Sequence, residues 1–67
     1  MIFEYVGLSR IIGSLVVLDG VEGASFEEMA ELKLADGSVR HGRIIRIDGK
    51  QVTIQVFEGT RGISMEN

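Results

Sequence analysis

Short runs of valine and isoleucine, broken by glycine, constrain the fold of this chain more than any other feature. The 67 residues include nine glycines and no proline. This composition is typical of short strands that are joined by tight turns. In residues 51–56 (QVTIQV) apolar and polar side chains alternate, so that one face packs and the other meets solvent. The sequence therefore predicts a mostly β structure.

The clearest hairpin lies in the second half of the chain. Residues 43–47 (RIIRI) precede the alternating run and form a second strand. Asp48-Gly49 stands between the two strands, and these residue types supply the positive φ angles that a two-residue hairpin turn demands. An antiparallel pair with its turn at Asp48-Gly49 is predicted.

A second hairpin is expected just before the first. Asp36-Gly37-Ser38 joins the short strands at residues 32–34 and 39–41 by the same turn chemistry. Its three-residue connection allows a β-bulge. Two hairpins therefore follow one another along the chain.

The first third of the chain holds two further apolar segments. Residues 15–18 (LVVL) form a continuous apolar run bounded by Gly13 and Asp19, as expected of a central strand that is covered on both faces. Residues 3–12 alternate less regularly, and Gly7 among their apolar side chains suggests one bent strand.

The segment at residues 25–32 gives conflicting signals. Ser25 with Glu28 fits a helix capping box, whereas residues 31–34 alternate like a strand. With some six short strands along the chain, an open sheet leaves two exposed edges, and closure removes both. The predicted fold class is all-β, a small closed six-stranded barrel built from short strands and tight Asp-Gly turns.

Composition bounds the domain count and the function classes. A chain of 67 residues forms one domain, residues 1–67, and buries only about 60% of the surface that its unfolded form exposes. Seven basic residues against ten acidic ones give a formal charge of -3, which repels a phosphate backbone. The sequence has no cysteine, so no disulfide cross-links the fold. No apolar run approaches the roughly 20 residues of a membrane span. We expect a marginally stable domain that contacts neither nucleic acid nor membrane and is stabilised by association with other subunits.

No catalytic or metal-binding constellation is recognisable. Gly42 and Gly49 are separated by six residues and Gln51 follows Lys50, whereas a phosphate-binding loop needs four residues between its glycines and a serine or threonine after the lysine. His41 is the single histidine and has no partner at a catalytic spacing. The acidic residues lack calcium-loop spacing and are expected to form a solvated loop; they are Asp19, Glu22, Glu27, Glu28 and Glu31. We expect no catalytic residue, cofactor or metal.

Three arginines leave one alternative function open. Arg40, Arg43 and Arg46 form a candidate basic stripe for RNA or a peptide, as in oligonucleotide-binding barrels of this size. At a period of two, Arg40 and Arg46 share a face while Arg43 points the other way, unless a bulge at Gly42 resets the register. No aromatic residue interleaves with them as a stacking platform would, so salt bridges to an acidic neighbouring subunit are their favoured role.

The end of the chain carries a distinctive string, QVFEGTRGI at residues 55–63. It resembles the sequence that closes the N-terminal barrel of the B subunits of V-type and A-type ATPases, the non-catalytic subunits of the rotary head. Residues 13–19 (GSLVVLD) are similar to the early strand of that family. Residues 34–38 (LADGS) with Gly42 are similar to its Leu-Pro-Asp-Gly turn followed by a glycine. Ala35 stands where proline is common, which leaves the hairpin intact.

The resemblance also indicates the subunit type. The corresponding barrel of the sister A subunit usually closes with a second acidic residue where Gly59 stands, so Gly59 favours the B type. The positions that carry the resemblance or the predicted turns are Gly13, Asp19, Asp36, Gly37, Gly42, Asp48, Gly49, Phe57, Glu58, Gly59, Thr60 and Gly62.

The resemblance implies a role in assembly. Residues 29–34 would form a strand after an irregular loop at residues 20–28, which replaces the capping-box interpretation. The nucleotide-binding domain with its ATP and magnesium would begin beyond Asn67, so this fragment would bind no cofactor and hydrolyse nothing alone. The barrel would hold A and B subunits in an alternating ring, on the cytoplasmic side of a membrane-associated ATPase or ATP synthase that moves protons or sodium. Isolated from its neighbours, it would expose surfaces that they normally cover, which leaves both a monomer and a self-associated form open.

Overall fold

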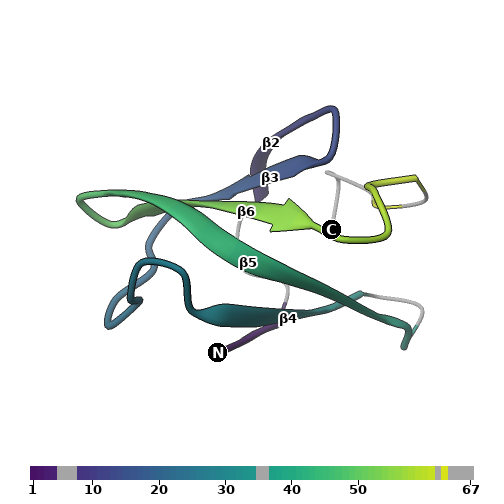
Figure 1. Ribbon diagram of the computed structural model, residues 1–67, viewed down its shortest axis with the longest axis horizontal. Coiled ribbons are helices and arrows are strands. Elements are labelled where there is room, and N and C mark those ends of the chain that lie inside the picture. Colours follow the sequence, from purple (N-terminus) through teal and green to yellow (C-terminus); the bar gives the residue numbers. More distant parts are fainter. Residues whose placement is uncertain (5–7, 35–36, 62, 64–67) are drawn as a thin grey trace.

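The chain forms one six-stranded sheet (Figure 1). The structure is a computed structural model and describes residues 1–4, 8–34, 37–61 and 63, of which the side chains of residues 8 and 9 are left out. The sheet order is β1-β4-β5-β6-β3-β2, in which β1 and β4 are parallel and all other neighbours antiparallel. The strands are β1 (Ile2–Glu4), β2 (Leu8–Ile12), β3 (Leu15–Leu18), β4 (Met29–Lys33), β5 (Val39–Asp48) and β6 (Gln51–Val56). The prediction of an all-β fold with six strands is confirmed.

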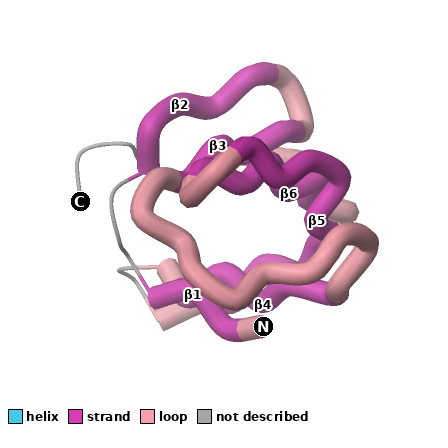
Figure 2. The backbone as a smooth tube through the Cα atoms, turned by 90° about the vertical axis from the view of Figure 1, so that its left-hand side faces the viewer, coloured by secondary structure: helices cyan, strands magenta, loops and turns pink. Residues whose placement is uncertain are grey.

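The sheet curls around a single apolar core. Figure 2 shows β1 and β4 on one side of the ring, β2, β3 and β6 on the opposite side, and β5 between them. The sheet order begins with β1 and ends with β2, and no strand pairing within the described residues joins these two ends, so closure of the barrel there stays a prediction. Burial of each aliphatic side chain in this core contributes about 1.5–3 kcal/mol to the free energy of folding. The buried core cluster consists of Phe3, Val16, Leu18, Val21, Ala30, Leu32, Ile44, Val52, Ile54 and Val56.

In β6 and β3 the buried residues are those that the sequence patterns predict. Val52, Ile54 and Val56 of β6 are buried and Gln55 is exposed, which confirms the predicted alternation. In β3 the last three of the four residues are buried, and the strand lies between β6 and β2. A central strand covered on both faces is therefore confirmed at residues 15–18.

The prediction of one bent strand at residues 3–12 is wrong. The segment forms two strands, and these lie at opposite ends of the sheet order. Phe3 of β1 is buried and pairs with Leu32 of β4, whereas Leu8 of β2 pairs with Leu18 of β3. The two halves have different neighbours, which explains why no single alternation runs through the segment. Gly7 lies outside the described residues.

The β5–β6 hairpin is confirmed, but its turn lies one residue later than predicted. Asp48 pairs with Gln51, so that the two-residue loop is Gly49-Lys50. Gly49 has a φ of 63°, and Lys50 is not among the residues with positive φ. This is the pattern of a type II′ turn, which needs a positive φ only at its first loop position. Gly49 meets that need alone, so Asp48 remains in the strand.

The β4–β5 hairpin is confirmed, but its three-residue loop lies between Leu34 and Ser38, one residue earlier than the predicted connection at residues 36–38. The Gly37 N–H donates to the Leu34 carbonyl at 3.0 Å, and the Leu34 N–H donates to the Ser38 carbonyl at 2.9 Å. Gly37 has a φ of 88°, the left-handed conformation expected of the bulge residue in such a loop. Asp36 lies outside the described residues.

Strand β5 merges two predicted strands and bends in its middle. Its pairing with β6 shifts between Ile44 and Arg46, so Ile45 is a bulged residue. On the other side, the Ile44 carbonyl accepts the Glu27 N–H at 2.8 Å and the Ile44 N–H donates to the Glu28 carbonyl at 2.9 Å. Glu27 has a φ of 67°, so it takes the left-handed position that a bulge of this kind usually gives to glycine. Two bulges at one point bend the strand around the core.

Half of the capping box is present, but it caps no helix. The Ser25 N–H donates to Oε1 of Glu28 at 3.0 Å, and the Glu28 N–H donates to the Ser25 carbonyl at 3.1 Å. The chain then enters β4 at Met29 and leaves it at Lys33, which confirms the predicted strand to within one residue. A Ser–Glu pair three residues apart fits a turn as well as a helix, and pairing with β5 decides between them.

Candidate functional site

The segment that follows β6 is the candidate site, because it carries the distinctive sequence and is fastened to the barrel at several points. Where β6 ends, the Val56 N–H donates to the Ser14 carbonyl at 2.9 Å. The next N–H, that of Phe57, donates to the His41 carbonyl at 2.9 Å. The chain thus leaves β6 between the β2–β3 turn and the first half of β5 (Figure 1, yellow).

Arg40 holds this segment with its guanidinium group. Nη1 donates to the Gly59 carbonyl at 3.1 Å and Nη2 donates to the Arg61 carbonyl at 2.6 Å. Arg40 pairs across the sheet with Leu32, which is buried, so Arg40 lies on the inner face near the start of β5. Hydrogen bonds from a cation are stronger than neutral ones, and the planar guanidinium can serve two carbonyls at once.

Thr60 fastens the same segment to the β2–β3 turn, because its hydroxyl donates to the Gly13 carbonyl. Gly59 has a φ of 79°, and its N–H donates to the Val56 carbonyl at 3.1 Å to close a turn. Ile63 then packs against the core, and its N–H donates to the Thr60 carbonyl at 3.1 Å. We call the set Gly13, Arg40, Gly59, Thr60 and Arg61 the exit clamp.

The side chains of the exit clamp bind main-chain atoms, and their role is to hold the backbone in place. The Arg40 guanidinium and the Thr60 hydroxyl both donate to main-chain carbonyls of this chain. Such contacts fix the path of the chain as it leaves the barrel and supply neither a nucleophile nor a general base. The distinctive string therefore encodes a defined exit from the barrel.

A second junction ties the loop after β3 to the β5–β6 turn. The Gln51 side-chain amide donates to Oδ1 of Asp19 at 2.9 Å, and the Val21 N–H donates to the Lys50 carbonyl at 2.8 Å. The Lys50 Nζ lies 3.0 Å from a carboxylate oxygen of Glu22. Asp19 and Glu22, both from the predicted acidic loop, are thus engaged in contacts within the chain.

Position 42 has no room for a side chain, so only glycine fits there. A Cβ atom at this position would lie 2.4 Å from the Gln55 carbonyl oxygen and 2.8 Å from Cγ2 of Ile54, much closer than side chains approach. β5 can therefore pack against β6 here only without a side chain. The glycines that instead take a positive φ at turns include Gly13, Gly37, Gly49 and Gly59.

The other predicted positions do not gather into one site. Asp48 is exposed, and its carboxylate lies 3.9 Å from Arg46. Phe57 and Glu58 are exposed beside the exit clamp, and Phe57 leaves 54% of its surface open. Asp36 and Gly62 lie outside the described residues.

The candidate arginine stripe is divided between the two faces of the sheet. Arg43 pairs with Gln55 and Arg46 with Thr53, both on the outer face, whereas Arg40 lies on the inner face. The prediction that Arg40 and Arg46 share a face is wrong, because the bulge at Ile45 lies between them and shifts the register by one residue. Sequence reasoning also missed what Arg40 binds, since backbone carbonyls have no signature in the sequence.

The side chain of His41 faces a carboxylate on the neighbouring strand. Its Nε2 lies 3.5 Å from Oε1 of Glu31, the residue opposite it on β4, and both side chains are about half exposed. Within the described residues, no three His, Cys, Asp or Glu side chains cluster as metal ligands would. The same residues include no helix of a length and apolar character suited to crossing a bilayer.

Comparison with known proteins agrees with the architecture. The model of the ATP synthase alpha/beta family, β-barrel domain, matches residues 8–67. V-type ATP synthase beta chain 2 of Clostridium tetani is 45% identical over 64 residues, which are 96% of this chain and 14% of that protein. The chain therefore spans about a seventh of the length of this relative.

Proposed function

Because this chain belongs to the ATP synthase alpha/beta family as its β-barrel domain, we propose that it is the N-terminal barrel of a B-type subunit of a V-type ATP synthase or ATPase and serves assembly. The observation that carries the proposal is the exit clamp, which holds the segment that follows β6 against the barrel. Most of the similar beta chain lies outside the matched region. We assign the proposed nucleotide chemistry to a domain other than this barrel.

A barrel with a fixed exit suits a rotary head. The nucleotide-binding domains of such a head open and close around a turning shaft, and alternating A-type and B-type subunits have to stay together while they do so. Six barrels joined in a ring supply a constant frame, and the exit clamp confines the movement to the domains that follow. ATP and magnesium bind in those domains.

The proposed complex is associated with a membrane, and its ring of barrels lies on the cytoplasmic side without touching the bilayer. Selection of the translocated ion, proton or sodium, takes place in other subunits.

The outer face of β5 and β6 is proposed to meet a neighbouring A-type subunit. Arg43 and Arg46 share this face and are exposed. Their described contacts within the chain are long, since Nη2 of Arg43 lies 3.9 Å from Sδ of Met29 and Nη2 of Arg46 lies 3.9 Å from Oδ2 of Asp48. Exposed cations with such weak partners suit acidic groups on a neighbour.

Charge reversal in the full-length subunit tests this role. We expect the double variant Arg43→Glu, Arg46→Glu to lose assembly with its A-type partner, measured by native mass spectrometry. Arg10→Glu is the matched control, because Arg10 is an exposed arginine on β2, at the other end of the sheet. Unchanged assembly of the double variant would refute the assignment of this face. Unchanged assembly of a subunit that lacks residues 1–67 would refute the assembly role itself.

A titration with nucleotide tests whether the barrel itself binds ATP. We expect no heat of binding when the 67-residue chain is titrated with magnesium and ATP at micromolar concentrations. Binding at those concentrations would place part of the nucleotide site in the barrel and overturn the division of labour proposed above.

A further inference from the structure

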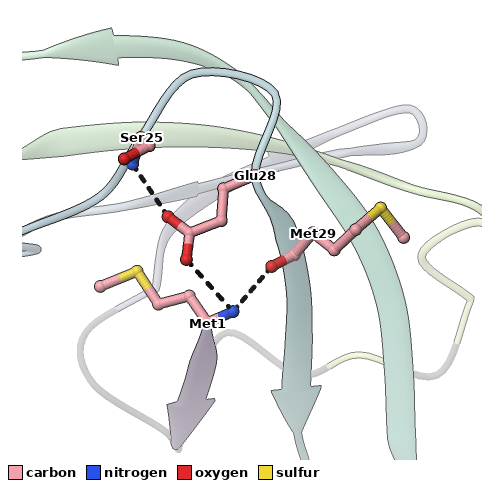
Figure 3. Close-up of polar contacts among 4 residues, drawn as sticks. All are labelled: Met1, Ser25, Glu28 and Met29. Carbon is pink, nitrogen blue, oxygen red and sulfur yellow. Dashed lines mark hydrogen bonds and ion pairs between the residues drawn. The ribbon is translucent and has the colours of Figure 1, made fainter.

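The corner where β1 meets β4 surrounds the α-ammonium group of Met1 with acceptors (Figure 3). The ammonium nitrogen donates to the Met29 carbonyl at 2.7 Å and lies 3.5 Å from Oε2 of Glu28. The side chains of Met1 and Glu28 are 24% and 34% exposed, so the pair is partly sheltered from solvent. In this chain the Met1 nitrogen therefore has one main-chain and one carboxylate acceptor at the corner between β1 and β4.

Glu28 is positioned for this contact by the loop in front of β4. Its other carboxylate oxygen, Oε1, accepts the Ser25 N–H at 3.0 Å, which fixes the orientation of the carboxylate. Its backbone is held on both sides, since its N–H donates to the Ser25 carbonyl and its carbonyl accepts the Ile44 N–H. A carboxylate restrained in this way loses little conformational entropy when it binds a cation.

The ammonium group stands at the start of a short edge strand. β1 has three residues, Ile2–Glu4, and lies at one end of the sheet order. The Glu31 N–H donates to the Met1 carbonyl at 2.8 Å, next to the register pair of Ile2 with Glu31. Phe3 is buried in the core from this strand. Anchoring Met1 therefore fixes the strand that places Phe3.

We propose that Ser25, Glu28 and Met29 form a binding site for a primary α-ammonium group, and that an acyl group on the Met1 nitrogen weakens the docking of β1 on β4. An acylated nitrogen is an amide, so it carries no charge for Glu28. It retains one N–H, which can still donate to the Met29 carbonyl. Acylation therefore removes the ion pair with Glu28 and leaves the hydrogen bond to the Met29 carbonyl. The contribution of the ion pair to stability can thus be measured separately from that of the hydrogen bond. An extension before Met1 has the same effect, because it converts the ammonium into a peptide group.

The proposal is tested with synthetic chains of the 67-residue sequence that carry either a free amine or an Nα-acetyl group. We expect acetylation to lower the folding equilibrium constant about two- to fivefold, as for a partly exposed ion pair. In chains with Glu28→Gln the effect of acetylation should disappear. Glu22→Gln is the matched control, because Glu22 pairs with Lys50 elsewhere and acetylation should act on this variant as on the parent chain. An equal effect of acetylation with Glu28 and with its glutamine variant overturns the proposal.

Amide hydrogen exchange gives a second readout that does not depend on global stability. We expect acetylation, or a Gly-Ser extension before Met1, to accelerate exchange at the Glu31 N–H, which donates to the Met1 carbonyl. The Leu34 N–H, which donates to Ser38 in the distant turn of β4, should keep its protection. Unchanged exchange at Glu31 in both the acetylated and the extended chain overturns the proposal.

Discussion

Replacing Arg40 by methionine isolates what the exit clamp contributes. Methionine keeps an unbranched apolar stem and removes both donors to the Gly59 and Arg61 carbonyls. Hydrogen bonds to a charged group contribute about 1.5–3 kcal/mol each when they are sheltered. The bond to Arg61 is exposed and the bond to Gly59 is only part-buried, so both carbonyls can bind water after the substitution. We therefore expect a total loss of about 1–3 kcal/mol in the free energy of unfolding.

A loss of this size is large for the domain. Natural domains have about 0.05–0.15 kcal/mol of stability per residue, and for chains of this length 1 kcal/mol shifts the melting temperature by roughly 4–8 °C. Arg40→Met should therefore melt about 8–16 °C lower if the loss is about 2 kcal/mol. The matched control is Arg43→Met on the same strand, which should change the free energy by less than about 0.5 kcal/mol because Arg43 is exposed.

Urea denaturation gives the global effect of Arg40→Met, and amide exchange shows where it acts. The Gly59 and Ile63 N–H groups donate within the outgoing segment, to Val56 and Thr60, and should exchange faster in the variant. The Val56 N–H, which donates to Ser14, should change less. Equal destabilisation by the Arg40 and Arg43 variants, or unchanged exchange at Gly59 and Ile63, would refute the reasoning.

Three further substitutions test the packing and the backbone. Gly42→Ala puts a Cβ atom 2.4 Å from the Gln55 carbonyl, so it should cost about 1–3 kcal/mol or more in urea denaturation, and an unchanged midpoint would contradict the close approach of β5 and β6. Glu27→Gly should raise the melting temperature by a few degrees, because Glu27 holds a φ of 67° at a cost of about 1–2 kcal/mol that glycine does not incur. The gain is smaller than this cost, because glycine also makes the unfolded chain more flexible. A lower melting temperature would argue against that conformation. Thr60→Val removes the hydroxyl donor to Gly13 and should cost about 0.5–1 kcal/mol in the same melt, whereas equal stability would show that the bond contributes nothing.

The elements that the sequence predicts best are those in which one local pattern is sufficient. The alternation of residues 51–56 shows which face of β6 is buried, and the apolar run at residues 15–18 gives a strand with both faces covered. Turn chemistry likewise places both hairpins, although a type II′ loop moves one turn to Gly49-Lys50. In each case the pattern that predicts the element lies within one short segment of the chain.

The features that the sequence does not predict depend on pairing across longer separations. β1 and β2 separate because one pairs with β4 and the other with β3, and irregular alternation alone could not show this. The bulge at Ile45 changes which face carries Arg46, and nothing in the local pattern marks it. Arg40 finds its acceptors 19 and 21 residues later along the chain, on backbone atoms that every residue type carries.

The same reasoning applies to the string at residues 55–63, in which Gly59 and Thr60 fix the path of the backbone. Gly59 is needed for a φ of 79°, and Thr60 is needed for a hydroxyl that reaches Gly13. An acidic side chain at Gly59, of the kind used above to separate A-type from B-type barrels, would cost about 1–2 kcal/mol in this conformation. A barrel with an acidic residue there would either hold it in this strained conformation, as this chain holds Glu27 at a φ of 67°, or close with a different turn. We therefore propose that Gly59 distinguishes the two subunit types through the conformation of the backbone that follows β6.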